Sequence, residues 1–139
     1  MEGIALEEYV NWDLATPGIS FDIKTGRVRL FKKTLEVMGY PEYFRFRFSP
    51  EDQVFGVEPC ALEDGGAYRL PAELPREHFE IKCLNLVRFV YRTCGWRKPL
   101  TYRIPGELLT PSGRLVYFDL RQAFEIHEGR MKETRKNGF

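Results

Sequence analysis

The sequence predicts an α+β domain in which antiparallel β-strands are joined by two short helices. In several short stretches apolar residues alternate with polar ones, which is the period of half-buried strands. In two other stretches apolar residues recur every three or four positions and a glycine follows, which indicates amphipathic helices with a left-handed C-cap. The 139 residues are enough to bury one core, so residues 1–139 are expected to form a single domain.

A first β-hairpin is expected between residues 19 and 30. Its inward-facing apolar residues are Ile19, Phe21, Ile23, Val28 and Leu30. Gly26 closes the turn, where its freedom to adopt a positive φ is needed. Because side chains alternate across a strand, Arg27 and Arg29 are expected to face outward together.

A two-turn helix is expected over Phe31–Met38, since its apolar residues recur at i, i+4 and i+7 and Gly39 follows. Lys32 and Lys33 lie in its first turn, where the helix dipole disfavours each cation by about 0.3–1 kcal/mol. Two interpretations stay open. Either water solvates the two lysines, or they assist an anion that binds at the helix N-terminus.

A second hairpin follows, with strands over Tyr43–Phe48 and Val54–Val57 and a proline turn between them. In the first of these strands three phenylalanines alternate with Arg45 and Arg47, so one face is aromatic and the other is basic. Such a strand can stack unpaired bases, as RNA-binding sheets do. Core packing is the commoner role of phenylalanines at a period of two, and it is the role expected here.

Residues 60–78 are acidic and rich in glycine and proline, which predicts a connector with one short strand near Tyr68–Leu70. Residues 82–94 then show helical periodicity and end at Gly95. The polar stripe of this second helix consists of Lys82, Asn85, Arg88 and Arg92. Its charge favours either an acidic partner molecule or the acidic residues 58–80 of the same chain, and the second is expected.

Strands over Leu100–Ile104 and Leu115–Leu120 complete the pattern, so the second half of the chain repeats the order of the first. An offset of 56 aligns Met38-Gly39-Tyr40 with Cys94-Gly95-Trp96 and Phe46–Phe48 with Tyr102–Ile104, and an offset of 61 aligns Val54–Val57 with Leu115–Phe118. Five extra residues around Pro105–Leu109 would account for the difference. The half-repeats 19–59 and 79–126 are either a true duplication with pseudo-two-fold symmetry or two similar units. The charged residues 129–139 are expected to form a frayed tail.

The net charge of +1 conceals blocks of opposite sign. Residues 22–48 carry +4, residues 49–80 carry −6 and residues 81–105 carry +6. Such blocks can create a positive face for a phosphate backbone, or they can neutralise one another.

No pattern typical of catalysis or of metal binding is found. The three cysteines show no C-x-x-C spacing, which favours reduced thiols in a cytoplasmic protein. His78 and His127 lie far apart, and neither a nucleophile turn nor a phosphate-binding loop motif occurs. We therefore expect no enzymatic activity, no cofactor and no metal. The chain starts without an apolar leader and no apolar run approaches 18 residues, so neither secretion nor membrane insertion is expected.

Several residues of Ile19–Pro59 together match a known pattern, namely Gly26-Arg27-Val28, Leu30, Leu35, Met38-Gly39, Phe46, Phe48 and Val54–Val57. With them this segment resembles the swapped-hairpin DNA-binding domain of the AbrB, SpoVT and MazE group. The resemblance implies a swapped-hairpin barrel made of two intertwined units, with DNA contacts from the first strands and the helix start. Carried over by position, the contacting residues are Lys24, Arg27, Arg29, Lys32 and Lys33.

We therefore expect a DNA-binding transcriptional regulator or mobile-element accessory protein that contacts the phosphate backbone through a basic corner between strand and helix. The alternative is a non-catalytic protein-interaction module, such as an inhibitor or an antitoxin-like partner, built on the same fold. The expected partner is duplex DNA or a protein. The protein would be a monomeric pseudo-dimer or a homodimer.

Overall fold

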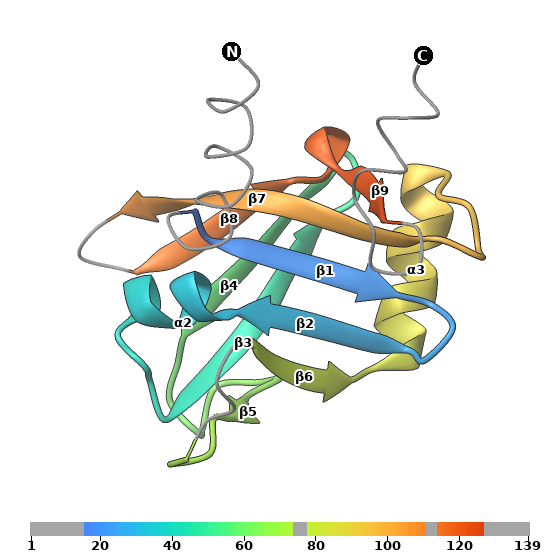
Figure 1. The fold of residues 1–139 in the computed structure, drawn as a ribbon. Helices are drawn as coiled ribbons and strands as arrows, with labels where there is room; N and C mark the ends of the chain where they lie inside the picture. Colours follow the sequence, from blue (N-terminus) through green and yellow to red (C-terminus); the bar gives the residue numbers. More distant parts are fainter. Residues whose placement is uncertain (1–15, 74–77, 111–113, 127–139) are drawn as a thin grey trace.

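The computed structural model describes residues 16–73, 78–110 and 114–126. These residues form an antiparallel sheet of nine strands with two α-helices, which confirms the α+β class (Figure 1). The strands are β1 (Gly18–Asp22), β2 (Arg27–Phe31), β3 (Tyr43–Ser49), β4 (Val54–Pro59), β5 (Tyr68–Arg69), β6 (His78–Lys82), β7 (Thr101–Thr110), β8 (Leu115–Asp119) and β9 (Phe124–Ile126). The helices are α2 (Lys32–Met38), α3 (Leu84–Cys94) and the 3-10 turn η1 (Leu120–Gln122).

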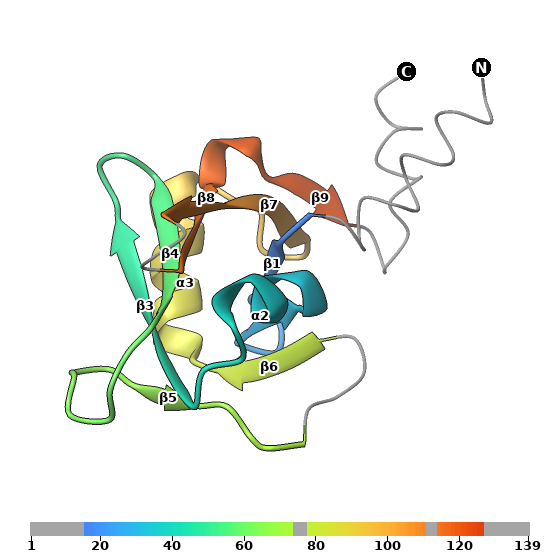
Figure 2. The same ribbon diagram turned by 90° about the vertical axis from the view of Figure 1, so that its left-hand side faces the viewer.

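The sheet curves into a half-barrel whose strands follow the order β5-β3-β4-β8-β7-β1-β2-β6, and β9 adds to β7 (Figure 2). The long strand β7 belongs to both parts of this sheet. Its first half pairs with β1 and β9, whereas its second half, from Gly106 onward, pairs with β8. The change of partner falls at Pro105 and Gly106, where the proline has no N–H to donate to a ladder. The N–H of Gly106 instead donates to the carbonyl of Pro17 at 2.8 Å.

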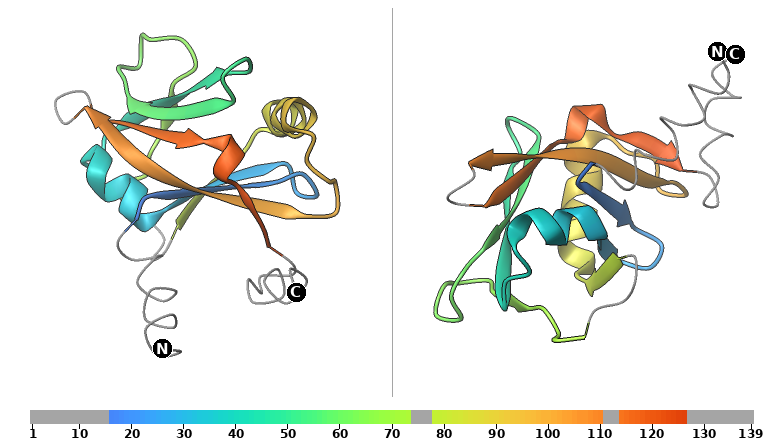
Figure 3. Two further views of the ribbon diagram at one scale, coloured as in Figure 1. Left: turned by 90° about the horizontal axis from the view of Figure 1, so that it is seen from above. Right: turned by 60° about the vertical axis from the view of Figure 1, so that its left-hand side comes forward.

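The two helices close opposite ends of the half-barrel. Helix α2 lies at the near end in Figure 2 and α3 at the far end, and the view from above in Figure 3 shows the same separation. The hydroxyl of Thr34 on α2 accepts a hydrogen bond from the N–H of Gly18 at 2.8 Å and donates one to the Gly18 carbonyl at 2.7 Å. The hydroxyl of Tyr91 on α3 lies 3.0 Å from the carbonyl of Phe21 and 2.5 Å from that of Leu100. One side chain thus ties each helix to β1.

Phenylalanines dominate the core between the two walls of the half-barrel. The largest fully buried side chains include Phe21, Phe44, Phe55 and Phe118. Phe21 and Phe55 meet edge to face with their centroids 5.1 Å apart, a favoured aromatic geometry. Phe44 is fully buried and Phe46 packs on Phe55, so the aromatic face of β3 serves the core as expected.

Most expected elements are confirmed at their expected places. Gly26, Gly39 and Gly95 have positive φ values of 69°, 81° and 68°, at the hairpin turn and at the two helix ends. Two expectations are wrong. Residues 78–82 form strand β6 instead of belonging to a connector and a helix, because they pair with the edge of β2. Residues 105–109 are the middle of β7 and not an insertion between strands. The expected tail at 129–139 lies outside the described residues.

Candidate nucleic-acid interface

Strands β2 and β6 together carry a group of charged side chains on the outer face of the half-barrel. Arg27 pairs in register with Lys82, and Arg29 pairs with Glu80. Partners in register point to the same side of a sheet, and the alternate residues Val28 and Ile81 are buried. Arg27 and Arg29 therefore face outward together, as expected, with Lys82 beside them. The β2–β6 face, as we call it, comprises Arg27, Arg29, His78, Glu80 and Lys82.

Glu80 is the carboxylate that the cations of this face share. Arg27 Nη1 lies 3.1 Å from Oε1, while Arg29 Nη2 and His78 Nε2 lie 2.6 Å and 3.2 Å from Oε2. Partial burial alone would raise the pKa of the Glu80 carboxyl, but the hydrogen bond from Arg29 and the charges of Arg29, His78 and Arg27 outweigh it, and the pKa is lowered. Glu80 is therefore ionised at neutral pH. With Lys82 included, the face holds three permanent cations and one carboxylate, and the carboxylate of Asp22 on β1 lies opposite Arg27 in register.

The five residues carried over from the swapped-hairpin family do not form one corner. Arg27 and Arg29 share Glu80, and Lys33 pairs with Glu36 at 3.6 Å. Lys32 and Lys33 begin α2 at one end of β2, whereas Lys24 lies in the turn at the other end, beside α3. Five residues of strand rise separate these ends by roughly 16 Å. The structure thus arranges the expected residues along β2 instead of gathering them at the helix start.

A hollow beside α3 gathers a second set of cations that the sequence did not single out as a site. Its volume is about 530 Å³. The α3 hollow, as we call it, is lined by Lys24, Arg88, Arg92 and Lys98 together with the aromatic rings of Tyr91 and Trp96. No Asp or Glu belongs to its lining. The signal in the sequence was the block 81–105, which holds six basic residues and no acidic one.

The acidic residues 58–80 were expected to neutralise α3, and those of them that the structure describes do not do so. Within the described ranges, none of the exposed cations Lys82, Arg88, Arg92, Arg97 and Lys98 has a carboxylate within 4.0 Å. Glu80 pairs with Arg27 and Arg29, while Glu58 pairs with Arg45 and Arg47. The acidic segment thus neutralises the first basic block, because its glutamates lie on strands β4 and β6, which pair with β3 and β2.

The arginines of β3 provide a comparison with the β2–β6 face. Arg45 and Arg47 stand two residues apart and share Glu58, at 2.8 Å and 3.3 Å. The hydrogen bond to Glu58 raises the pKa of Arg45, and the charges of Glu58 and Asp64 add to this effect. Asp64 is therefore a second carboxylate that acts on Arg45. The strand paired with β3 has no lysine equivalent to Lys82 of β6, which pairs with Arg27. Of the two arginine pairs, only that of β2 lies on a face with excess positive charge.

The remaining chemistry of the described segments is limited. No three His, Cys, Asp or Glu side chains among them come together as metal ligands. Burial raises the pKa values of the Cys83 and Cys94 thiols to about 11, so both are protonated at neutral pH and are poor nucleophiles. Neither helix in this part of the chain is long and apolar enough to span a membrane.

The protein therefore belongs to the class of antiparallel half-barrels, and its β2–β6 face gives it a basic outer surface. The chain matches no family model, no curated protein and no solved structure.

Proposed function

We propose that the protein binds duplex DNA through the phosphate backbone and acts as a transcriptional regulator or mobile-element accessory protein. The observation that carries this proposal is the β2–β6 face, where the three cations Arg27, Arg29 and Lys82 outnumber Glu80 even when the neighbouring Asp22 of β1 is counted. Cations that neutralise phosphates release counterions, and this release supplies most of the sequence-independent affinity for DNA. Lys24 and α3 extend the positive surface at one end of β2. A cytoplasmic location, where reduced thiols persist, is part of the proposal.

The strand pairing supports an internal pseudo-two-fold axis in which β1, β2, α2, β3 and β4 correspond to β5, β6, α3, β7 and β8. Under this correspondence β2 pairs with its equivalent β6, and β4 pairs with its equivalent β8. Strands that lie next to a two-fold axis pair in this way. The hairpin β3–β4 corresponds to β7–β8, and the pair β1–β7 corresponds to β5–β3. Each of these pairings therefore has an equivalent in the other half, whereas the β1–β2 pairing has none, because β5 pairs with β3 and not with β6.

The register between β4 and β8 agrees with the same axis. The predicted offset of 61 relates Phe55 to Val116 and Val57 to Phe118. Phe55 pairs with Phe118 and Val57 pairs with Val116, so the two pairs are equivalent by a two-fold rotation about the central Gly56–Tyr117 pair. The alignment predicted for Phe46–Phe48 does not agree. Val57 and Phe118 are equivalent positions at the offset of 61. Phe46 pairs with Val57 and Gly106 pairs with Phe118, so the equivalent of Phe46 is Gly106 and not Tyr102.

The same pairing supports a swapped-hairpin arrangement. The hairpin β1–β2 joins the rest of the sheet through β7, which belongs to the other half, and not through β3 of its own half. Two intertwined units of this kind make a dimer when each comes from a separate chain. We propose that one chain here supplies both units, so the native mass should be that of a monomer, and a homodimer would argue against this part of the proposal.

The triple variant R27A/R29A/K82A is expected to bind mixed-sequence duplex DNA roughly tenfold or more weakly than the wild type at low salt. Each phosphate contact that the variant loses should also lower the slope of log affinity against log salt by about 0.9. Gel shifts at two salt concentrations measure both effects. The native mass is determined on the same samples.

The matched control is R45A/R47A, which removes the other pair of arginines that shares one glutamate. Its DNA affinity should stay close to that of the wild type, because its face lacks the excess of cations. Equal losses in the two variants would mean that total charge and not the β2–β6 face determines binding. Wild-type protein that shows no salt-sensitive binding would refute the DNA-binding proposal.

Glu80→Gln is expected to increase DNA affinity about three- to tenfold at low salt, because it removes the carboxylate that Arg27 and Arg29 share while keeping its shape. The same variant should lose roughly 1 kcal/mol of stability, since the side chain of Glu80 is 24% exposed and its ion pairs are partly screened. Gel shifts and denaturant unfolding measure the two effects on one preparation. A variant with weaker DNA binding would show that Glu80 mainly positions the arginines.

The lowered pKa of Glu80 also predicts a dependence of stability on pH. A carboxyl with a lowered pKa in the folded state stabilises the protein above the ordinary glutamate pKa of about 4.3, and this contribution is lost as the pH falls through the lowered value. The wild type should therefore lose more stability than Glu80→Gln between neutral pH and acid. Parallel stability curves would contradict this role of Glu80.

An apolar hollow favours the alternative of a protein-interaction module. It lies on the outer side of β4 and β8 and has a volume of about 510 Å³. Its lining includes the apolar side chains of Phe48, Leu109, Leu115 and Tyr117, with Arg47 and Ser49 beside them. Leu109 is 53% exposed, which is high for a large apolar side chain. Capture of one stoichiometric protein partner without nucleic acid would favour this alternative over DNA binding.

A further inference from the structure

We propose that the α3 hollow is a binding site for one phosphate group, and that its counterpart beside α2 lacks the cations needed for this role. The hollow lies between the last turns of α3 and the β1–β2 turn. Its four cations come from three separate segments, with Lys24 from the turn, Arg88 and Arg92 from α3, and Lys98 from the loop after α3. These like charges line one hollow although they repel one another, and an anion bound there would reduce that repulsion.

The cations of the α3 hollow are available to a ligand. All four are exposed, and in the described parts of the chain none has a carboxylate within 4.0 Å. The guanidinium of Arg92 lies 5.7 Å from the centroid of the Phe89 ring, a contact that leaves its N–H groups free to donate. Two guanidinium groups and two ammonium groups suit the several oxygens of a phosphate, which accepts charge-assisted hydrogen bonds from each.

The backbone at the end of α3 does not prevent anion binding. Helix C-termini carry partial negative charge, because the last carbonyls lack partners within the helix. Here the N–H of Trp96 donates to the carbonyl of Tyr91 at 3.0 Å, and the N–H of Gly95 donates to that of Arg92 at 3.4 Å. The hollow is lined by the side of the helix, through Arg88, Tyr91 and Arg92, as well as by Trp96 and Lys98 beyond its end.

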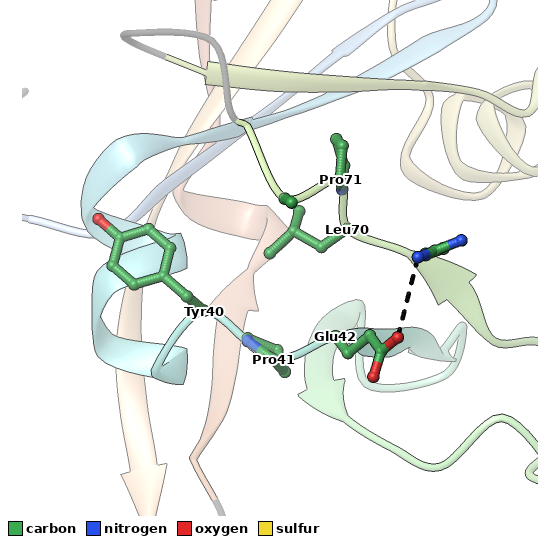
Figure 4. Close-up of a pocket in the computed structure, with 7 residues that line it drawn as sticks. Tyr40, Pro41, Glu42, Leu70 and Pro71 are labelled. Atoms are coloured by element: carbon green, nitrogen blue, oxygen red, sulfur yellow. Dashed lines mark ion pairs between the residues drawn. The ribbon is translucent and has the colours of Figure 1, made fainter.

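A second hollow occupies the corresponding place beside α2. It has a volume of about 520 Å³ and is lined by Tyr40, Pro41, Glu42, Arg69, Leu70 and Pro71 (Figure 4). In each hollow a glycine in the left-handed conformation ends the helix and an aromatic residue follows, Tyr40 after Gly39 and Trp96 after Gly95. The strand beside the hollow is β5 in one case and β1 in the other, which correspond under the proposed two-fold axis.

The two hollows differ in charge. Three residues after the helix-ending glycine stands Glu42 in one hollow and Lys98 in the other. Glu42 pairs with Arg69 at 4.0 Å, as the dashed line in Figure 4 shows, so the hollow beside α2 has one cation and one carboxylate. The hollow beside α3 has four cations and no carboxylate. The two halves thus share a shape, and only one half has the charges of a phosphate site.

One phosphate group per chain follows from this difference. The inference rests on the proposed function in taking a DNA backbone phosphate as the ligand, whereas a free phosphate monoester would satisfy the same groups. If the ligand is DNA, a single site at one end of the β2–β6 face would hold the duplex in one orientation despite the two-fold symmetry of the fold. Phosphate binding and DNA binding are therefore tested separately.

The test uses the full chain with Trp12→Phe, which leaves Trp96 as the only tryptophan of the two. Inorganic phosphate is titrated at constant ionic strength while the fluorescence of Trp96 is recorded, and calorimetry gives the stoichiometry. We expect saturable binding of one phosphate per chain that chloride does not reproduce. Adding R88Q/R92Q/K98Q should weaken phosphate binding about tenfold or more, because it removes three charge-assisted donors. Glutamine is a good helix former, and unfolding curves verify that this variant is folded.

The control variant is E42Q/R69Q, which alters the hollow beside α2 and should leave phosphate binding unchanged. The proposal is overturned by an absence of saturable binding, by an equal response to chloride, by undiminished binding in the folded triple variant, or by two phosphates per chain. Gel shifts with the triple variant then identify the source of the phosphate. Weaker DNA binding indicates a backbone phosphate, and unchanged DNA binding indicates a free phosphate monoester. If the wild type binds phosphate but not DNA, the DNA-binding proposal is refuted and the phosphate site is not.

Discussion

Gly106→Ala is expected to lower the free energy of unfolding by about 3 kcal/mol, in the upper part of the range for overpacked cores. A Cβ at this position would lie 2.3 Å from Cε1 and 2.6 Å from Cδ1 of Phe118. Phe118 is fully buried in the core, so its ring has little free space to enter. The backbone is equally constrained, because Gly106 pairs with Phe118 and donates its N–H to Pro17. Denaturant unfolding measures the loss.

A double-mutant cycle identifies the cause of this loss. Phe118→Ala alone should cost about 3–5 kcal/mol, as for other buried phenylalanines. If the clash with the ring is the reason, G106A/F118A should be no less stable than F118A, because the added methyl group then has room. Gly65→Ala is the matched control, since a Cβ there meets nothing within 4 Å. Additive losses would place the cause in the backbone of β7 and not in the ring.

Thr34→Val is expected to destabilise the protein by about 2–4 kcal/mol although valine has nearly the same shape. The Thr34 hydroxyl bonds to both the N–H and the carbonyl of Gly18, and its side chain is fully buried. Valine would leave two buried backbone groups without partners, each at a cost of about 1–3 kcal/mol. Unfolding in denaturant gives the loss. Hydrogen exchange of the Gly18 amide should accelerate as well.

Thr34→Ser serves as the control for this variant. It keeps the hydroxyl and removes one methyl group, so it should cost only about 1 kcal/mol. Valine and serine variants of equal stability would mean that packing, and not the pair of hydrogen bonds, holds α2 against β1. The same bonds place the start of α2, so Lys32 and Lys33 should be displaced in the valine variant only.

The local features of the fold followed directly from residue types. The hairpin turn at Gly26 and the helix ends at Gly39 and Gly95 require a positive φ that glycine adopts at little cost. The outward direction of Arg27 and Arg29 follows from alternation along a strand. Such features depend only on neighbours within a few residues, and for that reason the sequence was sufficient.

Strands β6 and β7 could not be predicted in the same way. Residues 78–82 form β6 because the edge of β2 offers hydrogen bonds to them, whereas their two apolar residues, Phe79 and Ile81, alternate over too short a run to predict a strand. Proline usually ends a strand, but β7 continues through Pro105 because its pairing partner changes from β1 to β8 at this point. In both cases tertiary pairing overrides the local preference.

The sequence by itself determined which side chains of β2 face outward, where the helices end and that residues 81–105 form a basic block. Only the tertiary structure decided which of these charges are neutralised. Arg29 and Glu80 are 51 residues apart and meet because β2 and β6 are adjacent, and Lys24 joins Arg88 and Lys98 because α3 closes the end of the barrel next to the β1–β2 turn. Charges of one sign can be counted along a chain, but their partners depend on contacts between segments that are distant in sequence. For this reason part of the candidate site lies on the β2–β6 face and in the α3 hollow, and not at the start of α2 where the sequence predicted it.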